Sequence, residues 1–353
     1  MDLPDDFGLN PAATLAHVAD PTPPPGFLQF WCAWQERVDA VVPAFRDPLP
    51  GEHDVTGPAL ATHVLESVGG ARIGCRISQP SETPRCVVVA LHGYVIDEPT
   101  IPERVSWCPN DAVCVNVRVR GYPGSTWGDA DADTVDTGYI TIGLADEQSW
   151  ILGGAVADVL LAVRAARAQW PHLPVSLAGE SFGGGLAVIA TSLLNPCEAP
   201  DRLALGLPTF GDWDWRLERS ARAGSGLEIE HFIRDRRDQE TRIRRTLRQF
   251  DATVHAKRIA VPTICKLACA DDVVPAPSAA AVFNALGTPA GEKWRFITPF
   301  GHYDGGIANA RRHALFERLA KRFLTCAESP AEAIEPWCGV LQQGEREPDG
   351  IGA

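Results

Sequence analysis

The stretch that decides the fold is residues 175–185, VSLAGESFGGG, which has the pattern of a strand, a sharp turn and a helix. Residues 174–178 are a short apolar run behind a proline, as is typical of a buried parallel strand. Residues 179–183 fit Gly-x-Ser-x-Gly, and the apolar residues 186–194 predict a buried helix. The glycines permit a strained backbone and a close approach of strand and helix, so we expect Ser181 at an exposed tip.

A serine at this turn would lie at the N-terminus of a helix. Unpaired N–H groups and the helix dipole stabilise a developing oxyanion there. The stretch therefore predicts a nucleophile elbow with Ser181 as the nucleophile. A chance match by a glycine-rich loop is the alternative, and the strand and helix that flank the motif weigh against it.

Strands and helices are expected on both sides of the elbow. The sequence predicts a hairpin from residues 61–67 and 72–78, and further strands at 85–91, 111–118, 202–207, 263–268 and 293–297. It predicts helices at 27–45, 147–170, 276–286 and 307–324. This alternation implies an α/β-hydrolase fold, with a mainly parallel twisted sheet, helices on both faces, and functional groups at the carboxyl ends of the strands.

The chain is expected to form one main domain, residues 26–325. A proline-bearing arm, residues 1–25, precedes it, and a polar, weakly ordered tail, residues 326–353, follows it. Within the domain, residues 218–256 include a strongly charged helical stretch at 228–250, which we interpret as a surface or lid-like insertion.

The composition excludes several classes of partner. The net charge of −13 over 353 residues disfavours nucleic acid and anionic membrane surfaces. We find no apolar run of transmembrane length and no signal-peptide pattern at the acidic N-terminus. The ten cysteines lack metal-binding spacing, and several lie in apolar runs, so we expect reduced thiols and a cytoplasmic location.

A serine nucleophile needs a general base, which in this fold lies downstream. Of the four downstream histidines, His231, His255 and His313 fall in charged helical stretches, where we expect solvated side chains. His302 instead lies in a glycine-rich loop, residues 299–306, between a strand and the last helix. His302 is therefore the candidate base.

The base needs an orienting carboxylate, and Asp271 and Asp272 follow the strand at 263–268. A carboxylate at this place can accept the Nδ1–H of His302, which fixes the tautomer and stabilises the imidazolium. We favour Asp271 because it is nearer the strand end. One of the two aspartates could instead cap a turn or the following helix.

The oxyanion hole needs two N–H groups. One should come from Phe182, the residue after the nucleophile, and the other from the loop after the strand at 85–91. That strand ends in His92, Gly93 and Tyr94, so the backbone N–H of Tyr94 is the second candidate. His92 itself is expected to be structural.

These motifs together resemble carbohydrate esterase family seven, the acetyl xylan esterases and cephalosporin C deacetylases, from about residue 26 to residue 323. The segments that carry the resemblance are residues 91–94 (LHGY), 117–121 (VRVRG), 179–185 (GESFGGG), 250–252 (FDA), 256–262 (AKRIAVP) and 271–275 (DDVVP). The resemblance implies a triad of Ser181, Asp271 and His302, oxyanion donors at Tyr94 and Phe182, and a toroidal hexamer. This chain has Tyr122, Phe182 and Tyr303 where the family usually has glutamine, glutamine and glutamate.

The first hypothesis for function is a serine esterase that removes short acyl groups, above all acetyl, from O-acetylated carbohydrates, with no metal or organic cofactor. The second is a carboxylesterase or thioesterase for other acyl groups, since aromatic residues at 182 and 303 suit an apolar pocket. The third is a catalytically silent hydrolase fold used for binding. Four aromatic residues are candidates for contacting substrate, although each could simply be packed: Tyr122, Trp127, Trp213 and Trp215.

Overall fold

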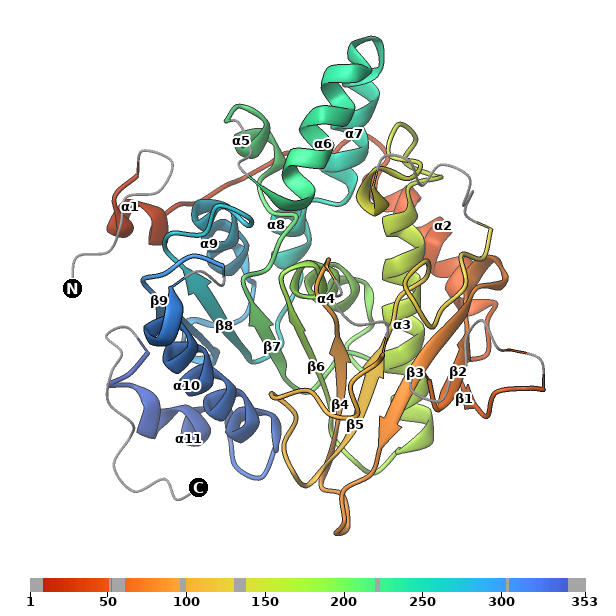
Figure 1. Cartoon of the computed structure of the whole chain (residues 1–353), viewed down its shortest axis with the longest axis vertical. Helices are drawn as coiled ribbons and strands as arrows, with labels where there is room; N and C mark the ends of the chain where they lie inside the picture. Colours follow the sequence, from red (N-terminus) through yellow and green to blue (C-terminus); the bar gives the residue numbers. More distant parts are fainter. Residues whose placement is uncertain are drawn as a thin grey trace.

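The computed structural model describes residues 9–50, 52, 61–95, 100–129, 138–219, 223–302 and 305–341. Among these residues, one nine-stranded sheet has the order β1-β2-β3-β5-β4-β6-β7-β8-β9 (Figure 1). β1, β2 and β3 pair antiparallel, β3 joins β5 antiparallel, and the other neighbours pair parallel. The strands are β1 (Phe45–Arg46), β2 (His63–Glu66), β3 (Arg72–Ser78), β4 (Cys86–Leu91), β5 (Ala112–Val117), β6 (Val175–Glu180), β7 (Leu203–Gly206), β8 (Thr263–Ala268) and β9 (Lys293–Thr298).

Helices connect the strands and cover the sheet. The α-helices are α1 (Pro11–Leu15), α2 (Phe27–Asp39), α3 (Ile151–Gln169), α4 (Phe182–Leu193), α5 (Trp213–Leu217), α6 (Gly224–Asp235), α7 (Glu240–Gln249), α8 (Ala252–Ala256), α9 (Ala276–Ala285), α10 (Gly306–Leu324) and α11 (Pro330–Ile334). Short 3-10 turns are η1 (Val68–Gly70), η3 (Tyr139–Thr141), η4 (Arg237–Gln239), η5 (Ala290–Glu292) and η6 (Glu335–Trp337). None of the described helices is long and apolar enough to cross a membrane.

The two faces of the sheet bury separate hydrophobic clusters. Alternate residues of β4 point to opposite faces, so Val87 and Val89 enter the larger cluster, with α2, α3, α4, α8 and α9. Val88 enters the smaller cluster, which α10 and the segment around α11 cover. The predicted fold class, a mainly parallel sheet with helices on both faces, is confirmed.

The C-terminal segment differs from expectation. Residues 326–341 are not weakly ordered. They contain α11, and Trp337 is only 1% exposed because it packs into the smaller cluster. The backbone N–H of Ile297 in β9 also donates to the carbonyl of Leu341. The prediction of weak order rested on the prolines and acidic residues of this segment. It did not take account of the apolar side chains that pack the segment against the body.

Two peripheral segments lie near the carboxyl ends of the parallel strands. The charged insertion forms α6 and α7, which project at the top of the molecule in Figure 1. The described part of the arm, residues 9–25, contains α1, which packs on α9. Asn284 of α9 donates to the carbonyls of Leu15 and His17, so the arm is held by the body rather than by a core of its own.

Candidate active site

The elbow is a strained turn between β6 and α4. Ser181 has φ 55° and ψ −115°, a backbone conformation that non-glycine residues rarely adopt. A Cβ on Gly179 would lie only 2.4 Å from the carbonyl oxygen of Gly183, so the turn requires glycine there. Ser181 donates its N–H to the carbonyl of Gly206, at 2.7 Å, which ties the strained residue to the neighbouring strand β7. Its side chain is not at a freely exposed tip, because the residue is 8% exposed.

A histidine and an aspartate pair beside the elbow. The Nδ1 of His302 lies 2.7 Å from Oδ2 of Asp271, and Asp271 is 1% exposed. The other oxygen, Oδ1, accepts the backbone N–H groups of Val273 and Val274 at 2.9 and 2.8 Å. These two bonds fix the carboxylate and leave Oδ2 for the imidazole, so the structure pairs His302 with Asp271.

The strands bring this pair to the same edge of the sheet as the serine. Ser181 follows β6, Asp271 follows β8, and His302 follows β9, and all three strands run parallel. The carboxyl ends of parallel strands meet at one edge, which is where this class of fold places functional groups. His302 also lies within electrostatic range of Glu180, the residue before the serine.

The two candidate oxyanion donors lie at neighbouring strand ends. β4 and β6 pair parallel, with Leu91 opposite Gly179. The start of α4 presses against the end of β4, because a Cβ on Gly183 would lie 2.7 Å from the carbonyl oxygen of His92. The rings of Tyr94 and Phe182 are 5.8 Å apart. Within the described part of the chain, neither of their backbone N–H groups donates to a protein acceptor.

His92 fixes the orientation of one of these donors. Its Nε2 accepts the N–H of Val119 at 3.2 Å, so the hydrogen of the neutral ring is on Nδ1. Burial lowers the pKa of His92 to about 3, which keeps the ring neutral. Nδ1 then donates to the carbonyl of Gly93, at 2.7 Å. That carbonyl and the N–H of Tyr94 belong to one peptide group, so His92 has the structural role expected of it.

Tyr94 is held at both ends. Its hydroxyl donates to Glu228 of α6 at 2.6 Å and accepts the N–H of Ile140 at 3.0 Å. Its carbonyl oxygen accepts the hydroxyl of Tyr122 at 2.9 Å. The insertion is therefore docked onto Tyr94, which carries one of the candidate oxyanion donors. The charged sequence pattern of the insertion did not single out this contact of Glu228.

The four aromatic candidates do not form one group. Tyr122 lies beside the elbow, with its ring 5.9 Å from that of Phe182, and Trp127 packs beyond it against Tyr139 at 6.2 Å. Trp213 is 1% exposed and stacks on Phe210 in the interior. Trp215 lies in the same short helix, α5, but its ring packs against His17 of the arm, at 5.5 Å. The sequence offered no signal for Tyr139, which stands among these rings.

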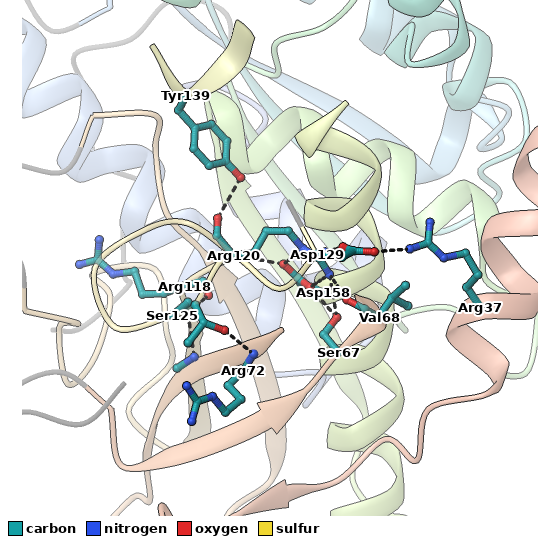
Figure 2. A network of polar contacts seen from close by, with 12 residues as sticks. Arg37, Ser67, Val68, Arg72, Arg118, Arg120, Ser125, Asp129, Tyr139 and Asp158 are labelled. Carbon is teal, nitrogen blue, oxygen red and sulfur yellow. Dashed lines mark hydrogen bonds and ion pairs between the residues drawn. The ribbon is translucent and has the colours of Figure 1, made fainter. Parts of the chain in front are cut away.

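A buried ion pair anchors the loop that carries Tyr122 (Figure 2). The guanidinium of Arg120 is 2% exposed and donates to both carboxylate oxygens of Asp158, which is fully buried. Arg120 also donates to Ser67 and to the carbonyl of Val68, and its own carbonyl accepts the hydroxyl of Tyr139 (Figure 2). Truncating one member of such a pair would leave a buried charge without its partner.

Two expectations about histidine are not met. His255 is fully buried rather than solvated, and its ring lies 2.6 Å from the hydroxyl of Ser192 and 3.2 Å from the carbonyl of Gln249. His313 is partly buried, and its Nδ1 lies 2.6 Å from the ammonium of Lys266. The sequence pattern could not show this, because the contacts of both rings come from residues distant in the sequence. His231 is exposed, as expected, and Tyr303 lies outside the described residues.

The described residues contain no group of three or more His, Cys, Asp or Glu side chains that could hold a metal ion. All ten cysteines lie in the described ranges, and none is in a disulfide.

The elbow, the buried Asp271–His302 pair and the parallel sheet define a serine hydrolase with the α/β-hydrolase fold. The family model for acetyl xylan esterase (AXE1) matches residues 29–317, and the chain belongs to this family. The chain is a carboxylic ester hydrolase of the serine type.

Solved structures share the fold. The chain is similar to an acetyl xylan esterase from Paenibacillus sp. R4, with a TM-score of 0.70, 20% identity, and coverage of 87% of this chain and 98% of that one. It is also similar to acetyl xylan esterase 1 from Thermoanaerobacterium sp. JW/SL YS485, with a TM-score of 0.66, 20% identity, and the same two coverages, 87% and 98%. A prolyl endopeptidase structure matches with a TM-score of 0.52 and 19% identity, over 75% of this chain and 38% of that one.

Proposed function

We propose that this protein removes acetyl groups from O-acetylated carbohydrates through a covalent acetyl-enzyme. The observation that carries the proposal is the strained elbow of Ser181 beside the buried Asp271–His302 pair, in a chain of the acetyl xylan esterase family. The two similar structures are acetyl xylan esterases, which supports an acetylated polysaccharide or oligosaccharide as the substrate class.

Each residue of the site has a role in the proposed reaction. The hydroxyl of Ser181 attacks the ester carbonyl, and His302 takes its proton and later gives it to the departing alcohol. Asp271 holds the Nδ1–H of His302 and stabilises the imidazolium. The backbone N–H groups of Tyr94 and Phe182 bind the oxyanion of the tetrahedral intermediate. Water, activated by His302, then releases acetate and restores the serine.

The aromatic residues near the elbow suit a small acyl group and a sugar. Tyr122 and Tyr139 pack against each other and against the buried ring of Phe182, with centroids 4.5 to 5.9 Å apart. We propose that the rings of Tyr122 and Tyr139, fixed in this way, limit the acyl chain to acetyl, with Trp127 at the outer end. Trp213 and Trp215 remain weaker candidates, because the first is buried and the second packs on the arm.

Hydrolysis of p-nitrophenyl esters from acetyl to octanoyl tests the proposal. The wild type should prefer acetyl, and Ser181→Ala should lose activity by at least about a thousandfold. Ser106→Ala, at an exposed serine bonded to Glu317, is the matched control and should keep wild-type activity. Release of acetate from acetylated xylo-oligosaccharides then tests whether the substrate is a carbohydrate.

Other outcomes would redirect the proposal. A preference for longer acyl chains would move the substrate towards the carboxylesterase or thioesterase hypothesis and keep the triad. Equal turnover by wild type and Ser181→Ala would remove the elbow as the site. If an organophosphonate failed to label Ser181, the silent, binding-only hypothesis would replace the esterase.

The cellular setting belongs to the proposal as well. Six of the ten cysteines are buried, where a free thiol packs as a small hydrophobe, and we propose a reducing compartment, the cytoplasm. Family resemblance supports a homo-oligomer, with the hexamer as the candidate state. Light scattering on a size-exclusion column measures that state, and a monomeric mass would count against it.

A further inference from the structure

A buried lysine lies beneath the elbow. Glu180, Gly206 and Lys266 are side by side in register on β6, β7 and β8. Lys266 is 1% exposed, and its ammonium forms an ion pair with the carboxylate of Glu180. Burying a charged side chain costs free energy even when it is paired, and an apolar residue would fill the same space at lower cost. The lysine therefore calls for an explanation other than packing.

Gly206 is what allows the two charged side chains to meet. A Cβ at this position would lie 3.0 and 3.1 Å from Cγ and Cδ of Glu180, and 2.8 Å from the ring of Trp107. Because β7 has no side chain here, Glu180 crosses over it and reaches Lys266 on the next strand. The three positions therefore form one arrangement across three strands.

The ammonium has a second partner on the last helix. Its Nζ lies 2.6 Å from Nδ1 of His313 in α10, and the rings of Trp107 and Phe316 lie 5.9 and 5.3 Å from it. Burial and the neighbouring Lys266 lower the pKa of His313 to about 4, so its ring is neutral near pH 7 and can accept from the ammonium. The same ring also contacts the backbone of His302.

We propose that Lys266 is a positioning residue for the esterase reaction. It holds Glu180 beside the nucleophile, holds the loop of His302 through His313, and cancels the charge of Glu180 next to the catalytic imidazole. This inference rests on the proposed function, since it assigns Lys266 to the same site.

The charges around His302 explain why cancellation matters. Asp271 faces it from the loop after β8, Glu180 from β6 and His313 from α10, and Lys266 of β8 pairs with both Glu180 and His313. Glu180 and Lys266 carry opposite charges in one ion pair, so Asp271 is left as the carboxylate beside His302 whose charge no lysine cancels. Removing one member of the pair should therefore move the acidic limb of the pH profile of kcat/KM, and removing the other should move it in the opposite direction.

The test is the pH profile of kcat/KM for p-nitrophenyl acetate, together with the pH profile of Ser181 phosphonylation, which needs no ester substrate. Lys266→Met should raise the apparent pKa of the acidic limb by about one unit, which makes kcat/KM about tenfold lower on that limb. Glu180→Gln should lower the apparent pKa, and the double variant should return it close to the wild-type value. Lys257→Met, at an exposed lysine paired with Asp20, is the matched control.

The outcomes separate this inference from the proposed function. If both single variants kept the wild-type pH profile of kcat/KM, the proposed role of Lys266 would be overturned and the proposed esterase function would be unaffected. A lower melting temperature or a lower kcat, with the apparent pKa of the acidic limb unchanged, would also overturn it. Such a result would mean that Lys266 contributes only to packing. If Lys266→Met failed to fold, Glu180→Gln would test the inference alone: a lower apparent pKa of the acidic limb would support it, and an unchanged or higher one would overturn it. A wild-type enzyme that neither hydrolysed esters nor reacted with the phosphonate would refute the proposed function first, and this inference with it.

Discussion

Ser181 is one of a group of residues whose backbone is strained. Among the described non-glycine residues, positive φ angles occur at Ser181, Leu207, Phe210, Asp212 and Cys326. Three of these lie in the loop after β7, and that loop touches the elbow, since Thr209 donates its N–H to the carbonyl of Ser181. Strain of this kind persists only where the surroundings over-determine the backbone, and it collects at functional sites.

The carboxylate of Asp271 is the residue-scale feature with the clearest test. Asp271→Asn keeps the shape of the side chain but can present an amide N–H to His302, which favours the wrong tautomer. We expect kcat to fall on the order of a thousandfold to ten-thousandfold, with KM little changed. Steady-state kinetics on p-nitrophenyl acetate measure both.

Asp272→Asn is the control for this prediction, because the neighbouring carboxylate is not the one bonded to His302. The control should retain wild-type kinetics. A large loss in Asp272→Asn with normal activity in Asp271→Asn would show that the other aspartate orients the base.

At the scale of elements, the contact between α4 and β4 would position the two proposed oxyanion donors, Tyr94 and Phe182. A Cβ on Gly183 would lie 2.7 Å from the carbonyl of His92 and 2.9 Å from Cβ of Leu91. Gly183→Ala should therefore push the helix from the strand, lower the free energy of unfolding by about 1–3 kcal/mol, and lower kcat more than it raises KM. Urea unfolding and steady-state kinetics together check this.

Gly291→Ala is the matched control, because a Cβ there meets no atom within 4 Å and the position is remote from the elbow. It should leave both stability and kcat near the wild-type values. Normal kcat in Gly183→Ala would mean that the approach of α4 to β4 does not position the two N–H groups.

The elements that the sequence predicted best are those with strong local patterns. The strand at 263–268 matches β8, and the elbow strand and helix lie where the motif placed them. The Asp271–His302 contact was also expected, because both residues follow strands of one parallel sheet. Local patterns could not show which distant side chains meet. Lys266 interrupts an apolar strand, which was a visible signal, but its partners on β6 and α10 depend on tertiary packing.

At the scale of the whole molecule, buried neutral histidines make stability depend on pH. Burial lowers the pKa of His255 from 6.5 to about 3 in the folded state. The unfolded chain therefore binds more protons below pH 6.5, and the free energy of unfolding falls as the pH falls from about 6.5 towards 3. The contribution of His255 is about 1.4 kcal/mol per pH unit, or about 2 kcal/mol at pH 5.

Urea unfolding at pH 7 and pH 5 measures this effect. His255→Gln, which cannot titrate, should lose about 2 kcal/mol less than the wild type between the two pH values. His172→Gln, at an exposed histidine, should lose as much as the wild type. An equal loss in all three proteins would show that His255 does not contribute to the acid sensitivity.

The glycine of β7 has a consequence for engineering. Positions 180, 206 and 266 lie side by side across three strands, and any side chain at 206 would occupy the path of Glu180. A library that varies these positions one at a time would leave either a buried charge without its partner or a side chain at 206 that clashes with Glu180. One that varies them jointly could replace the charged pair and the glycine with apolar side chains of matching volume. Such a replacement would put an uncharged contact next to the nucleophile elbow, and the pH profile should stay close to that of the wild type, because the ion pair already cancels its own charge.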